Sequence, residues 1–327
     1  MSGPGPLATR TLERCPGCGA ADLAPLPLRY EFRGAFPLVE CRGCALRFLR
    51  VQPVGPALAE LYAPEYFERD FRCGRSDSAY FSEAAFREEN QALLDAFDAL
   101  ARAAAPRPAS PPRLLEVGCA GGWLLKHAVE RGWEAQGVEL SHAAVAHAHG
   151  LGLEVFEGDL LAAGFPAARF DVVYMGDVLE HLPDARAALD EVARVLKPGG
   201  HLYLRGPVTT HSLARRLALD VYRAAGATIV LREPPYHLWE FTPRSLRGLL
   251  ARVGLEITRL TQSKIPPGRP HGRKTALERA VLFALDALNL PLTLIFNAAG
   301  DRVVLVARKP ERTRVIPGPR PVATSAP

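Results

Sequence analysis

The sequence predicts an α/β protein in which a mainly parallel sheet carries helices on both faces and follows a small cysteine-rich module. From residue 113 onward, apolar runs of strand length alternate with amphipathic helix patterns. Before that point, four of the six cysteines form two Cys-x-x-Cys pairs in a stretch with little helical periodicity. With 327 residues, 48% of them hydrophobic, the chain can bury a full-size core beside a small accessory module.

Composition divides the chain into five regions. The first is rich in glycine and proline and the last is rich in proline, so both are expected to be disordered. A proline-rich run, APRPASPP, begins the sheet domain. The expected regions are a disordered N-terminus at 1–12, a metal-binding module at 13–50, a helical connector at 51–104, the sheet domain at 105–310 and a disordered tail at 311–327.

Within the sheet domain, residues that favour helix ends mark the boundaries between elements. Ser141 is a good helix N-cap, while Gly132 and the KPGG run at 197–200 end helices. Strands are therefore expected at 113–118, 134–140, 153–159, 170–177, 201–207, 255–260 and 301–310, and helices at 123–132, 141–150, 184–196 and 245–254.

Cys15, Cys18, Cys41 and Cys44 form the two pairs, which are separated by 22 residues. Four thiolates at the corners of a tetrahedron satisfy Zn²⁺ completely, so this spacing predicts a structural zinc ribbon whose metal contributes folding energy. The opening MSGPGPLATR lacks the apolar run of a secretory signal, and the reduced thiols of the cytoplasm favour metal binding over disulfides. Unliganded thiols and an iron–sulfur centre are the alternatives.

A glycine-rich turn, Glu116-Val-Gly-Cys-Ala-Gly-Gly122, follows the first predicted strand of the sheet domain. Such a turn between a strand and a helix lets a ligand approach the backbone closely. A dinucleotide site expects G-x-G-x-x-G, with a helix N-terminus aimed at a pyrophosphate. Here an acid stands two residues before the first glycine, and a carboxylate suits a cationic amino-acid cofactor better. A nicotinamide oxidoreductase is therefore disfavoured.

This turn resembles the first motif of class I S-adenosylmethionine-dependent methyltransferases, D/E-x-G-x-G-x-G. Glu116, Gly118 and Gly122 match, and Ala120 replaces the middle glycine. The resemblance covers about residues 110–310 and implies a Rossmann-like sheet whose loop packs under the methionine part of S-adenosylmethionine.

The same resemblance assigns the remaining cofactor contacts. It implies that Glu139 accepts hydrogen bonds from the ribose hydroxyls and that Asp159 binds the adenine amino group. Leu160 then offers its backbone N–H to the adenine ring. Gly176 lies at the end of the fourth strand of this pattern, where the cofactor site meets the catalytic edge.

The cysteine module adds to the resemblance. CRGCALRFLRVQP, followed by ELYAPEYF, is similar to the front end of bacterial zinc-ribbon methyltransferases that often accompany sugar and polysaccharide biosynthesis. This likeness implies methyl transfer to oxygen or carbon of a small-molecule or glycan acceptor, such as a sugar, a nucleotide sugar or a lipid-linked glycan.

His181 and His237 are the candidate catalytic residues. His181, in LEHLPD, follows the fourth strand, and His237, in PPYHLWEFT, follows the fifth. Histidine titrates near neutral pH, so either could accept a proton from the nucleophile. The alternative is that each only orders its loop.

Insertions at 208–236 and 262–300 are expected to shape the acceptor pocket. The second begins with five basic or histidine residues and continues into an apolar helical pattern. We therefore expect a cytoplasmic protein in which residues 273–299 either touch the inner membrane face peripherally or pack as a lid helix. No segment offers the ~20 consecutive apolar residues of a transmembrane helix.

Two other functions are kept as alternatives. An RNA methyltransferase with an RNA-reading ribbon is disfavoured because the formal net charge of +5 is modest. A non-catalytic binding protein that retains the fold is disfavoured by the intact cofactor acids Glu116, Glu139 and Asp159.

Overall fold

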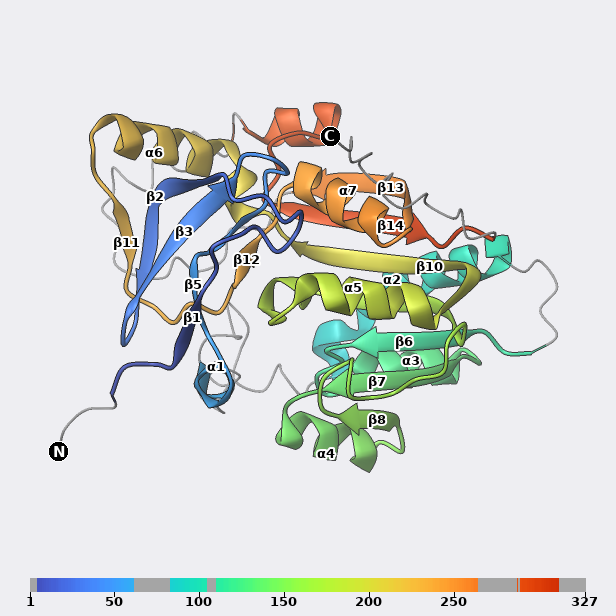
Figure 1. Cartoon of the computed structure of the whole chain (residues 1–327). Helices are drawn as coiled ribbons and strands as arrows, with labels where there is room; N and C mark the ends of the chain where they lie inside the picture. Colours follow the sequence, from blue (N-terminus) through green and yellow to red (C-terminus); the bar gives the residue numbers. More distant parts are fainter. Residues whose placement is uncertain (1–4, 62–82, 105–109, 264–286, 288, 312–327) are drawn as a thin grey trace, which may run out of the picture.

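The computed structural model describes residues 5–61, 83–104, 110–263, 287 and 289–311 (Figure 1). Several sequence predictions fall on other residues and so lie outside the described part of the chain. These are the disorder of residues 1–4 and 312–327, most of the proline-rich run, and the basic start of the second insertion at 264–274.

The sheet domain contains a seven-stranded sheet, as predicted. Its order is β13-β14-β10-β9-β6-β7-β8. The strands are β6 (Arg113–Val117), β7 (Glu134–Glu139), β8 (Glu154–Glu157), β9 (Phe170–Gly176), β10 (Leu196–Pro207), β13 (Glu256–Ser263) and β14 (Arg302–Arg308). The five strands from β10 to β8 are parallel, but β14 runs antiparallel to both β10 and β13. The sheet is therefore mixed, because β14 lies between β13 and β10 and runs in the opposite direction to both.

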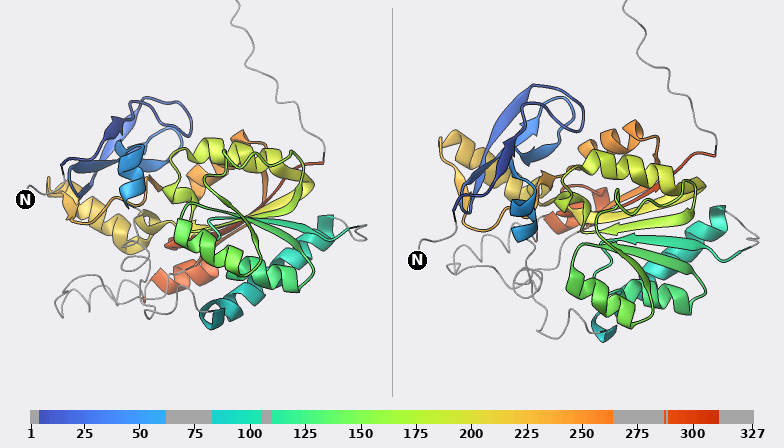
Figure 2. Two further views of the ribbon diagram at one scale, coloured as in Figure 1. Left: turned by 90° about the horizontal axis from the view of Figure 1, so that it is seen from below. Right: turned by 60° about the horizontal axis from the view of Figure 1, so that its bottom comes forward.

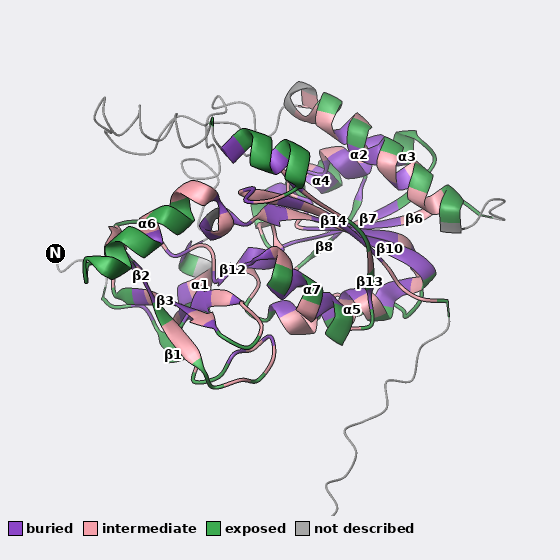
Figure 3. Ribbon diagram, turned by 90° about the horizontal axis from the view of Figure 1, so that it is seen from above, coloured by how far each residue is buried: buried purple, intermediate pink, exposed green. Residues whose placement is uncertain are grey.

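Helices cover both faces of this sheet, and Figures 2 and 3 show the two layers. One face carries α5 (Ala185–Val195) and α7 (Pro243–Arg252), and the other carries α2 (Glu83–Ala104), α3 (Trp123–Glu130) and α4 (His142–Gly150). Helix ends follow the expected chemistry, because the Ser141 side chain caps α4 and the Asp184 side chain caps α5.

Helix α2 corrects the prediction of a helical connector at 51–104. Phe97 on this helix packs between Tyr174 of β9 and Tyr203 of β10, at ring-centroid distances of 5.5 and 5.3 Å. The apolar face of α2 is thus buried on the sheet, which makes residues 83–104 part of the sheet domain.

The N-terminal module is larger than the predicted 13–50. Strand β1 (Thr9–Thr11) pairs with β5 (Val51–Pro53), so residues 9–11 are ordered although disorder was expected to residue 12. The backbone N–H of Leu12 also donates to the carbonyl of Arg50, at 2.8 Å. These pairings join the first residues to the end of the module, which continues into the short helix α1 (Pro56–Leu61).

The first insertion, 208–236, and the residues directly after it complete the sheet of this module. Strands β2 (Leu23–Glu31), β3 (Ala35–Cys41) and β4 (Arg47–Leu49) are flanked by β11 (Ile229–Leu231) and β12 (Trp239–Glu240) in the order β11-β2-β3-β4-β12. Helix α6 (Leu213–Ala224), in the same insertion, runs beside β2 (Figure 1). Residues 208–240 therefore belong structurally to the N-terminal module.

One continuous apolar core links the two parts. Phe36, Leu38 and Phe48 of the module belong to the same buried cluster as Leu246 and Leu249 of α7. The Phe48 and Trp239 rings lie 6.1 Å apart. Since the module and the sheet domain share their buried surface, they are expected to unfold together.

Truncation of this shared core tests the coupling. We expect Phe48→Ala to lower the free energy of unfolding by about 3–5 kcal/mol, because the ring is fully buried. Urea titration followed by circular dichroism and tryptophan fluorescence, at constant metal content, should give coincident single transitions for wild type and variant. Separate transitions for the two parts in the wild type would contradict a shared core.

Candidate active site

The glycine-rich turn after β6 has a backbone that only small residues tolerate. Gly118, Ala120 and Gly122 have φ values of 72°, 48° and 83°, in the left-handed region. A Cβ at Gly122 would lie 2.7 Å from Leu153 Cδ1, and a Cβ at Gly118 would clash with Val178. Positions 118 and 122 therefore need glycine both because a side chain would not fit and because φ is positive. Ala120 adopts a positive φ although it has a side chain.

The carboxylate of Glu139, at the end of β7, organises this turn. Its Oε2 accepts from the N–H of Ala120 at 2.9 Å, and its Oε1 accepts from the N–H groups of Leu140 and Ser141 at 2.8 and 2.9 Å. Glu139 is 8% exposed. A carboxylate can accept more than three hydrogen bonds. Glu139 could therefore still accept hydrogen bonds from ribose hydroxyls, as predicted.

Glu116 is a buried acid with an unfilled acceptor. Within the described part of the chain, no group donates to its Oε2, although the residue is only 7% exposed. Burial, and next the charge of Glu139, raise the pKa of Glu116 well above its ordinary value, against the opposing effect of Arg205. A cationic group placed here would pair with the carboxylate and offset its desolvation, as the resemblance implies for the amino group of the cofactor.

The two residues expected to bind adenine follow β8, next to Glu139. The N–H of Gly158 donates to the carbonyl of Glu139 at 2.9 Å, which holds the ends of β7 and β8 together. Asp159 is exposed and its Oδ1 accepts from the N–H of Ala162, while the Leu160 side chain is buried. Gly176 ends β9 and is paired with Arg205 of β10. The predicted cofactor residues thus come together at the carboxyl ends of adjacent parallel strands.

His181 and His237, predicted from separate segments, lie against each other. Their rings meet edge to face with centroids 4.9 Å apart. His181 is in the short 3-10 turn η2 (Leu179–His181), and its Nδ1 is 3.1 Å from the carbonyl of Tyr236. A carbonyl only accepts, so Nδ1 carries the proton and Nε2 keeps its lone pair in the neutral ring.

Two buried acids complete this cluster. Oε1 of Glu180 lies 3.9 Å from Nε2 of His181, and Oε1 of Glu240 lies 3.9 Å from Nδ1 of His237. Within the described residues, Oε1 of Glu180 has no hydrogen-bond partner. Sequence reasoning did not select either acid. For Glu180 a signal was available, because it is an ionisable residue that directly precedes His181 and follows a buried strand pattern. Glu240 carried no comparable signal.

The groups of this cluster are electrostatically coupled. Burial raises the pKa of Glu180 to about 8, and burial together with the charge on His237 lowers the pKa of His181 to about 3. Burial alone would lower the pKa of His237, but the nearby Glu240 carboxylate and the charges of Glu180 and Asp177 outweigh it and raise that pKa. The cluster can therefore exchange a proton near neutral pH.

The cluster has a second chemical capability. Glu180, His181 and His237 each offer a ligand atom, and all of these atoms lie within 4.8 Å of one another. A carboxylate and two imidazoles are a common donor set for divalent metal ions. Proton transfer and cation binding would use the same nitrogen and oxygen atoms here.

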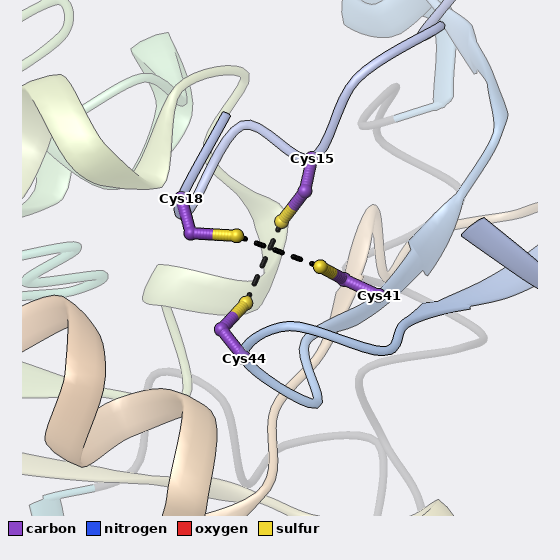
Figure 4. Close-up of side chains that lie close together, drawn as sticks. All are labelled: Cys15, Cys18, Cys41 and Cys44. Carbon is purple, nitrogen blue, oxygen red and sulfur yellow. Dashed lines mark hydrogen bonds between the residues drawn. The ribbon is translucent and has the colours of Figure 1, made fainter. Parts of the chain in front are cut away.

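The four cysteines converge on one point (Figure 4). The Sγ atoms of Cys15 and Cys44 are 3.5 Å apart, as are those of Cys18 and Cys41. Tetrahedral zinc with Zn–S bonds near 2.3 Å needs S···S distances of about 3.8 Å. Both turns have the same form, because Gly19 and Ala45, one residue past each pair, are left-handed and donate to the carbonyls of Cys15 and Cys41. The geometry fits a four-thiolate zinc site.

The chain is similar in sequence to proteins of a known family. A family model described as "Methyltransferase domain" matches residues 86–260. Ubiquinone biosynthesis O-methyltransferase of Xylella fastidiosa (strain 9a5c) is 32% identical over 181 residues, which cover 51% of this chain and 70% of that protein. The enzyme of the same name from Ralstonia nicotianae is 33% identical over 165 residues, covering 47% and 66%. A SAM-dependent methyltransferase from Archaeoglobus fulgidus, of known structure, is 18% identical, with coverage of 74% and 98% and a TM-score of 0.43.

The role of Glu139 can be tested by an isosteric change. Glu139→Gln keeps the shape but leaves one acceptor oxygen for three backbone donors, so the turn should lose its fixed form. We expect at least tenfold weaker binding of S-adenosylhomocysteine in calorimetric titration. Glu157→Gln, at the exposed end of the neighbouring strand β8, is the matched control and should bind as the wild type does. Equal affinity in the two variants would contradict this role.

Proposed function

We propose that this chain, which belongs to the S-adenosylmethionine-dependent methyltransferases, methylates a hydroxyl oxygen of a small-molecule acceptor. The observation that carries the proposal is the Glu180–His181–His237 cluster beside the cofactor turn. An oxygen nucleophile must lose a proton when it is methylated, and a buried group that takes up protons near neutral pH supplies that need.

The residues on the cofactor side fit S-adenosylmethionine. Glu116 would pair with its amino group, the turn at 118–122 would lie under its methionine part, and Glu139 and Asp159 would bind ribose and adenine. When bound, the cofactor supplies a methyl group on a positively charged sulfur. The protein then holds the acceptor in line with that methyl group and keeps water out, and positioning of this kind can provide much of the rate.

On the acceptor side, the chain's own groups handle the proton. His237 faces Glu240, which stabilises the ring when it is protonated, so it is the better proton acceptor. His181 stays neutral because its pKa is low, and its lone pair at Nε2 can orient a hydroxyl group. Glu180 can hold the proton after transfer because burial favours its neutral form.

Two acceptor classes follow from different observations. The curated relatives are named for ubiquinone biosynthesis, which supports a hydroxylated ring with a lipid tail. The likeness of the cysteine module to sugar-associated methyltransferases supports a sugar, nucleotide sugar or lipid-linked glycan. All of these present a hydroxyl oxygen, so the chemistry proposed for the cluster is the same. The modest net charge again favours a small molecule over RNA.

We further propose that Cys15, Cys18, Cys41 and Cys44 hold a structural Zn²⁺ ion. The clustering of the four sulfur atoms within 4.8 Å of one another supports it, and four thiolates would leave no open coordination position for chemistry. Through β4, the metal site would support the segment 236–240: the N–H of Leu49 donates to the carbonyl of Leu238 at 3.1 Å. The proposed role of zinc is therefore to hold His237 in place.

The proposed activity is tested in two steps. Calorimetric titration with S-adenosylhomocysteine establishes the cofactor site, and release of S-adenosylhomocysteine is then measured with a prenylated dihydroxybenzoate and with a nucleotide-linked hexose. Methyl transfer to a hydroxyl of either acceptor supports the proposal. Product carrying the methyl group on nitrogen or carbon would overturn it, and absence of cofactor binding by folded protein would favour the non-catalytic alternative.

The proton-accepting role predicts a pH dependence. The pKa of His237 is raised, so its ring is protonated at low pH and cannot accept a proton; Glu180 likewise ionises only as the pH approaches about 8. We expect kcat to rise with pH between 6.5 and 8.5. His237→Gln should lower kcat by about 10²–10⁴ and flatten this rise. His142→Gln, an exposed histidine on α4, is the control, and an unchanged pH profile in His237→Gln would refute the role.

Metal removal provides a separate test of the zinc proposal. We expect one zinc ion per chain by elemental analysis, reduced in Cys44→Ser but retained in Cys119→Ser, which changes a thiol outside the cluster. Chelation should lower both the unfolding midpoint and the methyl-transfer rate, because the module supports residues 236–240. Full activity of metal-free protein would show that zinc does not position the site.

A further inference from the structure

The helical residues 289–296 have their polar side buried and their apolar side exposed. Asn289 and Thr293, one turn apart, are 1% and 2% exposed. Their side chains bond to the carbonyls of Ala299 and Asn289, at 2.8 and 3.0 Å. Leu294, Ile295 and Phe296 are 70%, 72% and 69% exposed. A helix that faces only water has the opposite pattern, so the outer side of this one is suited to an apolar medium.

Helix α6 presents a second exposed apolar surface on the same side of the molecule. Leu219 anchors the helix to the core, while Leu217, Val221 and Tyr222 are exposed. Figures 1 and 2 show α6 next to the short helix that precedes β14, and Figure 3 shows the outer side of α6 as exposed.

Basic residues accompany these apolar side chains. Arg215, Arg216 and Arg223 are exposed on α6, with Asp220 as the single acid of that helix. Exposed leucine and aromatic side chains beside arginine and lysine are typical of segments that lie in the headgroup region of an anionic bilayer.

We propose that α6 and residues 289–296 together form a docking face for an anionic membrane surface. The apolar side chains enter the boundary between headgroups and acyl chains, and the basic residues contact lipid phosphates. The attachment proposed here is peripheral; no helix within the described ranges is long and apolar enough to cross a bilayer. A second copy of the chain is a poorer occupant, because a symmetric pairing of this face would bring the same arginines together.

The face adjoins the acceptor side of the active site. Helix α6 begins six residues after β10 ends, and the helix at 289–296 leads into β14, whose Arg302 contacts Asp177 beside the catalytic cluster. Docking would therefore turn this side toward the lipid. The inference does not depend on the acceptor, since it rests on exposure and charge alone.

Vesicle co-sedimentation tests the proposal independently of methyl transfer. Full-length protein is mixed with phosphatidylcholine vesicles with or without 30–40% phosphatidylglycerol, at low and high salt. We expect binding to the anionic vesicles that weakens as salt screens the charges. The double variant Ile295→Asp/Phe296→Asp and the double variant Arg215→Gln/Arg216→Gln should each reduce the partition coefficient at least tenfold. Val129→Asp, which changes an exposed valine on α3, is the matched control and should bind like the wild type.

The substituted side chains are exposed, and unchanged circular dichroism and cofactor titration would confirm that the variants fold. Absence of vesicle binding, equal binding to neutral vesicles, or binding unaffected by both double variants would overturn the proposal. A dimer that Ile295→Asp/Phe296→Asp dissociates, without vesicle binding, would assign the face to a second copy. Lower thermal stability of the same variant, without change in binding, would assign it to a covering segment of the chain.

Discussion

The acceptor side of the site depends on the backbone of residues 236–240, which is hydrogen-bonded from two directions. The N–H of Leu238 donates to the carbonyl of Glu180 at 2.9 Å, and the Trp239 indole donates to the carbonyl of Leu182 at 2.6 Å. On the other side, β4 pairs with β12, and the N–H of Leu49 in β4 donates to the carbonyl of Leu238. This short segment is therefore bonded both to the turn that carries His181 and to strand β4 of the cysteine module. These bonds hold the segment that carries His237 against His181.

The convergence of the cofactor-side residues could be predicted from sequence because its determinants are local. Glu116, Gly118 and Gly122 lie within one turn, and the end of each strand fixes where Glu139 and Asp159 lie. The pairing of His181 with His237 could not be predicted, because it joins residues 56 positions apart through an insertion without a recognisable motif. The same holds for β11 and β12, which are too short to give a strand pattern of their own. The boundaries at 12 and 50 were wrong because strand pairing between residues 9–11 and 51–53 depends on tertiary contacts.

Buried acids are concentrated at one edge of the sheet. Glu116, Glu139 and Glu180 are each less than 9% exposed, and two of them have an oxygen without a partner in the described structure. Burying such groups costs stability unless something pairs with them, so a fold retains them where binding or chemistry requires it. Glu139 is stabilised by backbone donors of the turn, whereas Glu116 and Glu180 are left for a ligand or a proton. The same end of the sheet thus carries one acid that shapes the turn and two acids that each keep an unfilled acceptor oxygen in the described structure.

The sheet of the cysteine module has a consequence for the order in which the protein forms. Its two outer strands, β11 and β12, are encoded about 200 and about 190 residues after the strands that they flank, β2 and β4. During synthesis the N-terminal part leaves the ribosome first, with β2 and β4 as open edges available to other strands. Those edges close only after residue 240 has been made, by which time most of the central sheet is also present. The module is therefore the first part of the chain to be synthesised and among the last to complete its fold.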